Sequence, residues 1–143
     1  MTERPRPVAL GIIREGDEIF VFEGHDPHKG ETFYRPLGGT IEFGERAADA
    51  VKRELSEEVG VTVSDATLLT VIENIFDWQG QTAHEIDFVF EVTLADPERL
   101  RSVDLIAYEA NGERINCMWK RLAEFRSGAR LYPLGLLGAL DAK

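Results

Sequence analysis

The chain of 143 residues carries a formal net charge of −10, which argues against a general binder of duplex DNA or RNA, because such a protein needs basic residues to neutralise phosphates. Its 43% hydrophobic and 29% charged residues are typical of a globular protein, and the length suits one domain over residues 1–143. The N-terminus is polar and the chain has no long apolar run, so we expect neither a signal peptide nor a membrane-spanning segment. The single cysteine, Cys117, cannot form an internal disulfide, so we expect a cytoplasmic protein.

The first third of the chain has the composition of β-structure. Strands are expected over residues 8–14 and 18–23, joined as a hairpin through residues 15–17. A turn-rich loop follows at 25–30, and a short strand is expected at 32–35. This strand leads to Gly38 and Gly39, where adjacent glycines would allow a sharp turn and a close approach to a ligand.

A helix is expected from about residue 46 to residue 59, because Ala47, Val51 and Leu55 recur at helical spacing and Gly60 is placed to end the helix in the left-handed conformation. After it the pattern predicts a loop with some extended structure at 101–112, strands at 66–76, 83–94 and 115–120, and short helices at 122–126 and 134–140. A mixed α+β sheet flanked by helices is the natural product of this order.

Three carboxylates gather on the predicted helix. Glu54, Glu57 and Glu58 are three and four residues apart, so they share one helix face, where like charges repel. A solvated acidic helix face is one interpretation. A divalent cation would offset the repulsion, because Mg²⁺ takes oxygen ligands and normally uses one or two carboxylates plus substrate phosphates. The cluster therefore predicts a metal site.

Residues 39–61, GTIEFGERAADAVKRELSEEVGV, resemble the Nudix box, written G-x5-E-x7-R-E-U-x-E-E-x-G-U with U an aliphatic residue. All nine specified positions match. The resemblance implies a Nudix-type α/β/α sandwich covering essentially the whole chain, and hydrolysis that depends on Mg²⁺ or Mn²⁺.

The resemblance also implies roles for individual residues. Glu54, Glu57 and Glu58 would be metal ligands, with the backbone carbonyl of Gly38 as a further ligand. Glu45 would be structural or would bind an additional metal ion. Bound metal ions polarise a phosphoryl oxygen and lower the pKa of bound water.

Arg53 lies one helical turn before Glu57. A surface ion pair worth about a few tenths of a kcal/mol is one interpretation. The resemblance implies instead that Arg53 orients a catalytic glutamate through a charge-assisted hydrogen bond. For the general base, the resemblance implies a glutamate in a loop before the strand that carries Trp119. Glu113 is our first choice and Glu109 the second, while an ordinary exposed loop acid or a role for Glu57 itself remain alternatives.

Tyr34, Arg35 and Gly39 are expected to contact the substrate, because family members often hold a base or phosphate beside these positions. Tyr34 can stack and Arg35 can pair with phosphate, although core packing of the aromatic ring is an equal alternative. Where many members read Leu-Pro-Gly-Gly, this chain has one residue more between proline and the glycines, which would reshape the substrate side of the loop.

On the strand at 83–94, Glu85 and Asp87 share one face, which either faces the phosphate cleft or is solvated.

The main hypothesis is a hydrolase of a phosphoanhydride in nucleoside diphosphate-linked substrates, with oxidised or ordinary nucleoside triphosphates and nucleotide sugars such as ADP-ribose as candidates. An isoprenoid diphosphate isomerase would need a catalytic cysteine and further glutamate features that the sequence does not display. A non-catalytic nucleotide sensor is the alternative from another class, and the intact box disfavours it. The expected partner is a small nucleotide, with a homodimer left open and neither duplex nucleic acid nor membrane expected.

Overall fold

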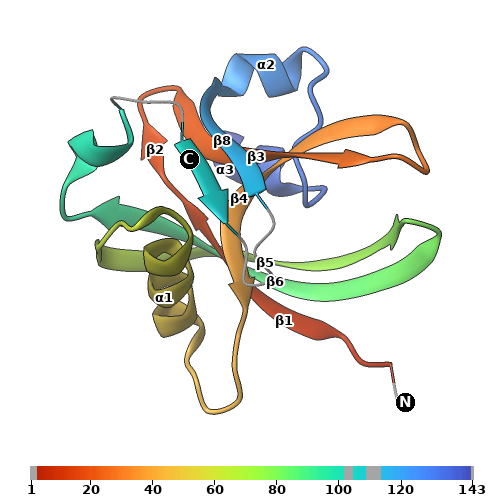
Figure 1. Ribbon diagram of the computed structural model, residues 1–143, viewed down its shortest axis with the longest axis horizontal. Coiled ribbons are helices and arrows are strands. Elements are labelled where there is room, and N and C mark those ends of the chain that lie inside the picture. Colours follow the sequence, from red (N-terminus) through yellow and green to blue (C-terminus); the bar gives the residue numbers. More distant parts are fainter. Residues whose placement is uncertain (1–2, 102–104, 109–113, 143) are drawn as a thin grey trace.

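The computed structural model describes residues 3–101, 105–108 and 114–142 of the chain. Its strands form a curled mixed sheet accompanied by few helices, which confirms the predicted α+β class (Figure 1). In chain order the elements are β1 (Arg6–Ile12), β2 (Arg14–Glu15), β3 (Glu18–Asp26), β4 (Glu31–Thr40), α1 (Ala47–Val59), β5 (Val63–Trp78), β6 (Gln81–Leu94), the 3-10 turn η1 (Pro97–Leu100), β7 (Leu105–Tyr108), β8 (Arg114–Arg121), α2 (Leu122–Arg126) and α3 (Leu136–Asp141).

The sheet bends at β4, because this strand pairs with two different neighbours. Residues 37–40 pair with β1 and residues 31–36 pair with β3. The strand order is β5-β6-β1-β4-β3-β8-β7, with β2 on β3. Among the described strands β1 and β6 run parallel, and the other neighbours are antiparallel. The β3–β4 and β5–β6 hairpins project from the same side of the molecule (Figure 1).

Alternating side chains of β1 enter two hydrophobic cores, one on each face of the sheet. Val8, Leu10 and Ile12 pack in the core that contains α2 and α3, whereas Ala9 packs in the core that contains α1. This alternation follows from the two-residue period of a strand. Helices therefore cover both faces, in agreement with the expected α/β/α layering.

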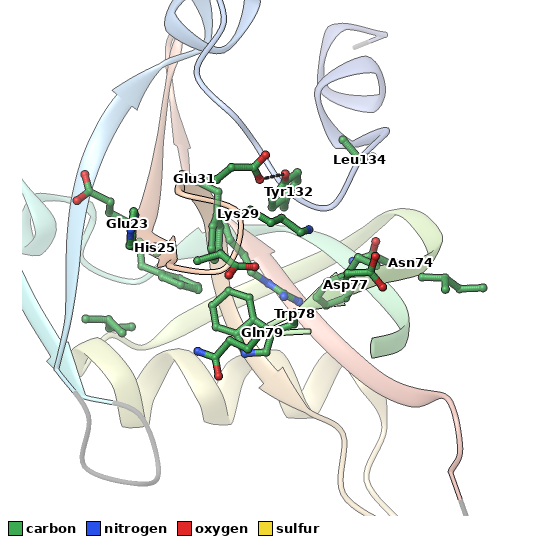
Figure 2. Close-up of a pocket in the computed structure, with 18 of the residues that line it drawn as sticks. Glu23, His25, Lys29, Glu31, Asn74, Asp77, Trp78, Gln79, Tyr132 and Leu134 are labelled. Atoms are coloured by element: carbon green, nitrogen blue, oxygen red, sulfur yellow. Dashed lines mark hydrogen bonds between the residues drawn. The ribbon is translucent and has the colours of Figure 1, made fainter. Parts of the chain in front are cut away.

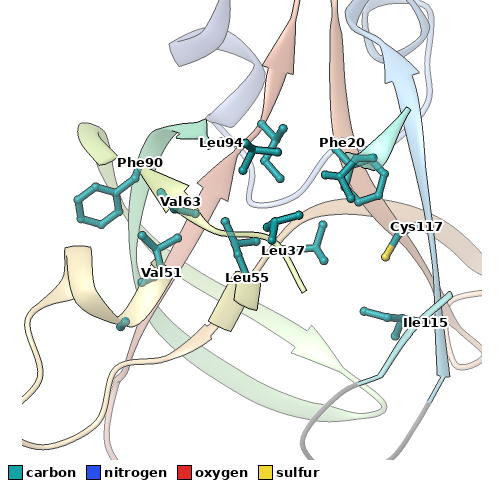
Figure 3. Packing of buried hydrophobic residues seen from close by; sticks show 14 residues of the cluster. Phe20, Leu37, Val51, Leu55, Val63, Phe90, Leu94, Ile115 and Cys117 are labelled. Atoms are coloured by element: carbon teal, nitrogen blue, oxygen red, sulfur yellow. The ribbon is translucent and has the colours of Figure 1, made fainter. Parts of the chain in front are cut away.

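Helix α1 packs closely on the sheet. Val51 and Leu55 are fully buried against it (Figure 3), and burying a side chain of this size contributes about 1.5–3 kcal/mol. The close packing depends on Gly11 of β1, where a Cβ would lie 2.9 Å from Leu55 Cδ1. As predicted, the helix ends at Gly60, whose φ is 70° and whose N–H donates to the Ser56 carbonyl at 2.9 Å.

The expectation of a sharp turn at Gly38 and Gly39 is wrong, because β4 runs through both residues to Thr40. Close packing explains the two glycines instead. A side chain at Gly38 would collide with the backbone carbonyl of Ala9, and a Cβ at Gly39 would lie 2.5 Å from the carboxyl carbon of Glu54. The glycines therefore allow the strand to approach its neighbours.

The hairpin of β5 and β6 is confirmed, although both strands extend further toward the turn than expected. Gln79 and Gly80 form the turn with φ values of 50° and 81°, the conformation of a two-residue hairpin. The strand at 115–120 and the last helix are confirmed within two residues, and β7 supplies the extended structure expected within 101–112. No helix in the described ranges is long and apolar enough to cross a membrane. The cytoplasmic location stays a prediction.

Candidate active site

The carboxylates of Glu54 and Glu58 lie against the two glycines of β4. The Gly38 backbone N–H donates to Glu58 Oε1 at 3.1 Å, and the missing side chain of Gly39 leaves room for the Glu54 carboxylate. Glu57 is the neighbour of Glu58, about 100° away around the helix. Its side chain is 57% exposed, against 18% for Glu54. Helix α1 thus directs two carboxylates toward β4 and a third toward more open surroundings.

Arg53 connects this cluster to the segment that precedes the helix. Its Nε and Nη2 donate to the two oxygens of Glu45 at 2.8 and 2.9 Å. Its Nη1 donates to Glu54 at 2.9 Å and to Glu57 at 3.4 Å, and Nη2 also donates to the Thr40 carbonyl at 3.1 Å. The contact with Glu57 is thus the longest of a network in which the bidentate pair with Glu45 is the tightest part.

The charges of this network are fixed by its hydrogen bonds. The hydrogen bond from Arg53, together with the backbone N–H of Glu42, lowers the pKa of Glu45 from 4.5 to about 2. The same bond to Glu45, and then the bond to Glu54, raise the pKa of Arg53 above its ordinary value. Both partners are therefore charged throughout the neutral range, and Glu45 places a negative charge just ahead of the helix N-terminus, where the helix dipole favours it.

The predicted donor set fits a hard divalent cation. The carboxylates of Glu54, Glu57 and Glu58 and the carbonyl of Gly38 are all oxygen donors, which suit Mg²⁺ or Mn²⁺. Within the described residues no three acidic, histidine or cysteine side chains, Glu54, Glu57 and Glu58 included, converge closely enough to hold a metal ion by themselves. An open arrangement fits Mg²⁺, which keeps several waters and combines one or two carboxylates with substrate phosphates.

A cleft of about 890 Å³ lies between the β3–β4 and β5–β6 hairpins. Figure 2 shows Glu31 and Tyr132 on one side of it and Trp78 with Gln79 on the other. Its walls come from β3, the β3–β4 loop, β4, β5, the β5–β6 turn, the start of β8 and the segment before α3: Phe22, Glu23, Gly24, His25, Asp26, Lys29, Glu31, Phe33, Arg35, Asn74, Ile75, Phe76, Asp77, Trp78, Gln79, Arg114, Ile115, Tyr132 and Leu134.

One face of β4 joins the cleft to the carboxylates. Side chains alternate along a strand, so Phe33 and Arg35, which line the cleft, share a face with Gly39, which lies beside Glu54. Tyr34 takes the other face, where its ring packs against Phe125 with the ring centroids 5.9 Å apart. The structure therefore brings Arg35 to the cleft and leaves Tyr34 outside it.

Aromatic rings from distant segments meet in the cleft. The ring of Phe33 lies 5.8 Å from that of Trp78 and 5.3 Å from that of Tyr132, measured between centroids. Gly24 permits this arrangement, because a Cβ there would collide with the Phe33 ring. The Tyr132 hydroxyl donates to Glu31 at 3.1 Å. These rings offer apolar faces on which a flat heterocycle can stack.

Sequence reasoning missed Trp78 and Tyr132. Trp78 lies beside a hairpin turn and Tyr132 directly before Pro133, and an aromatic residue next to a turn or a proline was the available signal. The solvated face considered for Glu85 and Asp87 is wrong, because both residues are buried. Glu109 and Glu113, the candidates for the general base, lie outside the described residues.

This curled mixed sheet, with a glutamate-bearing helix against two strand glycines, is the arrangement of a NUDIX domain, and residues 4–132 match the family model of that domain. The chain belongs to the NUDIX family.

Two curated relatives match part of the chain. It is 44% identical over 71 residues to the 8-oxo-dGTP diphosphatase of Escherichia coli K12, an alignment that covers 48% of this chain and 54% of that protein. It is 34% identical over 93 residues to the low-salt glycan biosynthesis protein Agl8 of Haloferax volcanii, covering 62% of this chain and 58% of that protein. The chain thus spans little more than half the length of either relative.

Solved structures share the fold. A MutT protein from Methanosarcina mazei superposes with a TM-score of 0.64 at 18% identity, covering 99% of this chain and 95% of that one. A NUDIX hydrolase from Nitrosomonas europaea gives a TM-score of 0.64 at 19% identity, covering 96% and 87%. At these identities the likeness concerns the fold.

Proposed function

We propose that this protein is a hydrolase, dependent on Mg²⁺ or Mn²⁺, that cleaves a phosphoanhydride bond in a nucleoside diphosphate-linked substrate. The observation that carries the proposal is the shared face of β4, which connects Gly39 beside Glu54 to Arg35 and Phe33 in the aromatic cleft. The four-residue step from Gly39 to Arg35 spans about 13 Å of strand. A substrate long enough to span this distance, past Leu37, which is buried on the same face, would place its nucleoside in the cleft and its phosphates beside the carboxylates.

Glu54, Glu57, Glu58 and the Gly38 carbonyl would hold the metal, and Gly38 contributes further by donating its N–H to Glu58. A bound divalent cation polarises a phosphoryl oxygen and lowers the pKa of water. Arg53 would position the carboxylates, because its guanidinium contacts both Glu54 and Glu57.

In the reaction, a water oxygen forms a bond to one phosphorus while the bond from that phosphorus to the bridging oxygen breaks. A glutamate accepts the water proton, and the bridging oxygen leaves with the second phosphoryl product. Glu113 is the first candidate for this base, followed by Glu109, with Glu57 as the candidate within the helix. Positioned general bases typically contribute about 10²–10⁴-fold in rate.

The candidate substrates are oxidised or ordinary nucleoside triphosphates and nucleotide sugars such as ADP-ribose. Stacking on Phe33, Trp78 and Tyr132 would hold the base. Arg35 supplies a cation in a cleft that also contains acidic side chains, and we propose that it pairs with an anionic oxygen of the substrate. The E. coli relative is named for 8-oxo-dGTP, so this nucleotide belongs among the compounds to test.

The alternative is a nucleotide sensor without catalysis. It would use the same cleft but would have no need for Glu54 and Glu58 beside the glycines of β4 with Glu57 next to them on the helix. A turnover panel separates the two functions: nucleoside triphosphates including 8-oxo-dGTP, ADP-ribose and dinucleoside polyphosphates, each with Mg²⁺ or Mn²⁺, and products resolved by chromatography. Metal-dependent release of phosphorylated products from at least one compound is expected. Tight nucleotide binding without any product would instead identify a sensor.

A further inference from the structure

Two buried carboxyl groups lie beneath the cleft. Glu85 and Asp87 are two residues apart on one face of β6, with exposed fractions of 3% and 0%. Their carboxyl groups are close enough to shift each other's pKa, and Asn74, which lines the cleft, donates from Nδ2 to Asp87 Oδ2 at 3.3 Å. Two buried acids in such contact resist double ionisation, because the charges repel in a poorly solvated site.

Arg35 reaches this pair from the cleft through one nitrogen. Its Nη2 donates to Glu85 Oε1 at 2.7 Å and lies 3.7 Å from Asp87 Oδ1. The other oxygen of Glu85 accepts from Arg6 Nη2 at 2.7 Å. The ion pairs of Arg35 with described residues all use Nη2, so its Nε and Nη1 remain outside them and can serve a ligand in the cleft.

The two acids differ in their charge. Burial raises the pKa of Asp87 to about 7, and the hydrogen bond with Glu85 adds to this effect. Burial also acts against ionisation of Glu85, but its pKa is lowered because Arg35, the hydrogen bond with Asp87 and Arg6 together stabilise the carboxylate. The charged groups that face Asp87 are Glu85 on its own strand and Arg35 on β4, while β5 contributes the neutral amide of Asn74.

We propose that the Glu85–Asp87 pair positions Arg35 and makes the affinity of the cleft for an anionic substrate depend on the protonation of Asp87. The proposal rests on the function proposed above, in which Arg35 binds an anionic oxygen of the substrate. Glu85 holds the guanidinium in place by its 2.7 Å contact. Asp87 then acts through Arg35, as a positioning residue that does not touch the substrate.

The electrostatic consequence has a definite sign. When Asp87 is protonated, Arg35 and Arg6 face one negative charge, that of Glu85, so this group of four side chains carries a net positive charge. When Asp87 loses its proton, the two arginines face two carboxylates, and the second carboxylate draws the guanidinium away from the cleft. The affinity of the cleft for an anion should therefore fall as the pH rises through about 7. One added negative charge, that of the Asp87 carboxylate close to the bound anion, should weaken binding by roughly fivefold to tenfold.

The test compares wild type with Asp87→Asn, which keeps the shape and stays neutral at every pH. Binding of α,β-methylene ADP, whose carbon bridge resists hydrolysis, is measured by calorimetry from pH 5.5 to 8.5 with Mg²⁺ present. Wild type and variant should bind alike at pH 5.5, and the variant should bind about fivefold to tenfold more tightly at pH 8.5. Titration of the ligand phosphates is the same for both proteins, so the difference reports Asp87. Asp65→Asn, the same substitution at an exposed position of β5, should behave as wild type.

A second measurement uses the wild-type protein alone, so it depends neither on the folding of a variant nor on catalytic activity. In wild type labelled with ¹³C at aspartate carboxyl carbons, one buried aspartate should titrate by NMR with a midpoint near 7 and should shift when the ADP analogue binds. In turnover assays the pH effect should fall on KM, with kcat at saturating substrate the same in wild type and Asp87→Asn.

Equal pH dependence of binding in wild type and Asp87→Asn, or the absence of an aspartate that titrates above pH 5, would overturn the proposal. Failure of the hydrolase function is a separate result: it would be seen as analogue binding with the predicted pH dependence but no turnover of any nucleotide.

Discussion

Arg53 illustrates how much one side chain organises in this protein. Its guanidinium uses three nitrogens to contact Glu45, Glu54, Glu57 and the Thr40 carbonyl. A planar fork can donate to two oxygens of one carboxylate and still reach a second acid, which a compact ammonium group cannot do. The residue therefore links the segment before α1 to the carboxylates on it.

For that reason Arg53→Lys should not rescue function. We expect its turnover at saturating metal to be at least about tenfold below wild type, because loss of a positioning partner of a metal ligand typically costs about 10–100-fold. Lys52→Arg, which changes the neighbouring basic residue without touching the network, should retain wild-type turnover. Steady-state rates of the three proteins test this positioning role. A wild-type rate in Arg53→Lys would show that Arg53 forms only a surface ion pair.

Gly39 offers a second test at the scale of one residue. In Gly39→Ala the new Cβ would lie 2.5 Å from the carboxyl carbon of Glu54, so the Glu54 carboxylate must move. We expect weaker Mn²⁺ binding by calorimetry and lower turnover, with the far-ultraviolet circular dichroism unchanged. Metal affinity and turnover equal to wild type would show that neither metal binding nor catalysis depends on the present position of the Glu54 carboxylate.

For the helices and strands, the sequence predicted the bounds of an element correctly where those bounds depend on residues close together in the chain. The start of α1 was predicted within one residue and its end at Val59 was predicted correctly, since the apolar spacing and Gly60 both lie within the segment. The role of the two β4 glycines was not predicted, because glycine is required there by Ala9 and Glu54, which lie on other elements and come close only in the fold.

The cleft and the Glu85–Asp87 pair could not be predicted from the sequence either, because residues distant along the chain form them. Phe33 meets Trp78 and Tyr132 only after two hairpins and the segment before α3 come together. Glu85 is buried by partners at positions 6 and 35, far away along the chain. The alternation that placed Glu85 and Asp87 on one face was correct, but a strand pattern does not reveal what covers that face.

The end of α1 provides a stability test with a matched control. Gly60 has a φ of 70° and ends the helix, so Gly60→Ala should destabilise the protein by about 1 kcal/mol. Gly138 lies in α3 with open space at its Cβ position, so Gly138→Ala should be neutral or stabilising by up to about 1 kcal/mol. Urea unfolding of both variants measures the difference, and equal effects at the two sites would contradict the proposed role of the left-handed cap.

At the scale of the whole molecule, two shifted carboxyl groups predict how stability changes with pH. Glu45 has a folded-state pKa of about 2 against 4.5, so its contribution is present above about pH 4.5 and is lost as the pH falls toward 2. Asp87 has a folded-state pKa of about 7 against 3.8, so the folded state keeps a proton that the unfolded chain releases. Its effect is a loss of stability as the pH rises from about 4 through 7.

These two groups together place the greatest stability where the two ranges meet, near pH 4. Asp87→Asn should remove the decline on the neutral side while leaving the acidic side unchanged. Thermal melts of both proteins from pH 3 to pH 9 would measure this, and parallel curves on the neutral side would contradict an Asp87 that keeps its proton to neutral pH.

We propose that the glutamates of α1 bind a divalent metal ion that the hydrolysis requires. The most direct measurement is a paired titration of Mn²⁺ affinity and product formation in wild type, Glu57→Gln and Glu58→Gln, with Glu73→Gln on the exposed face of β5 as control. We predict that wild type and the control bind Mn²⁺ and release phosphorylated products only when metal is present, whereas Glu57→Gln and Glu58→Gln bind it more weakly and lose turnover by orders of magnitude. Unchanged metal affinity and turnover in both glutamine variants would contradict a metal-binding role of these glutamates.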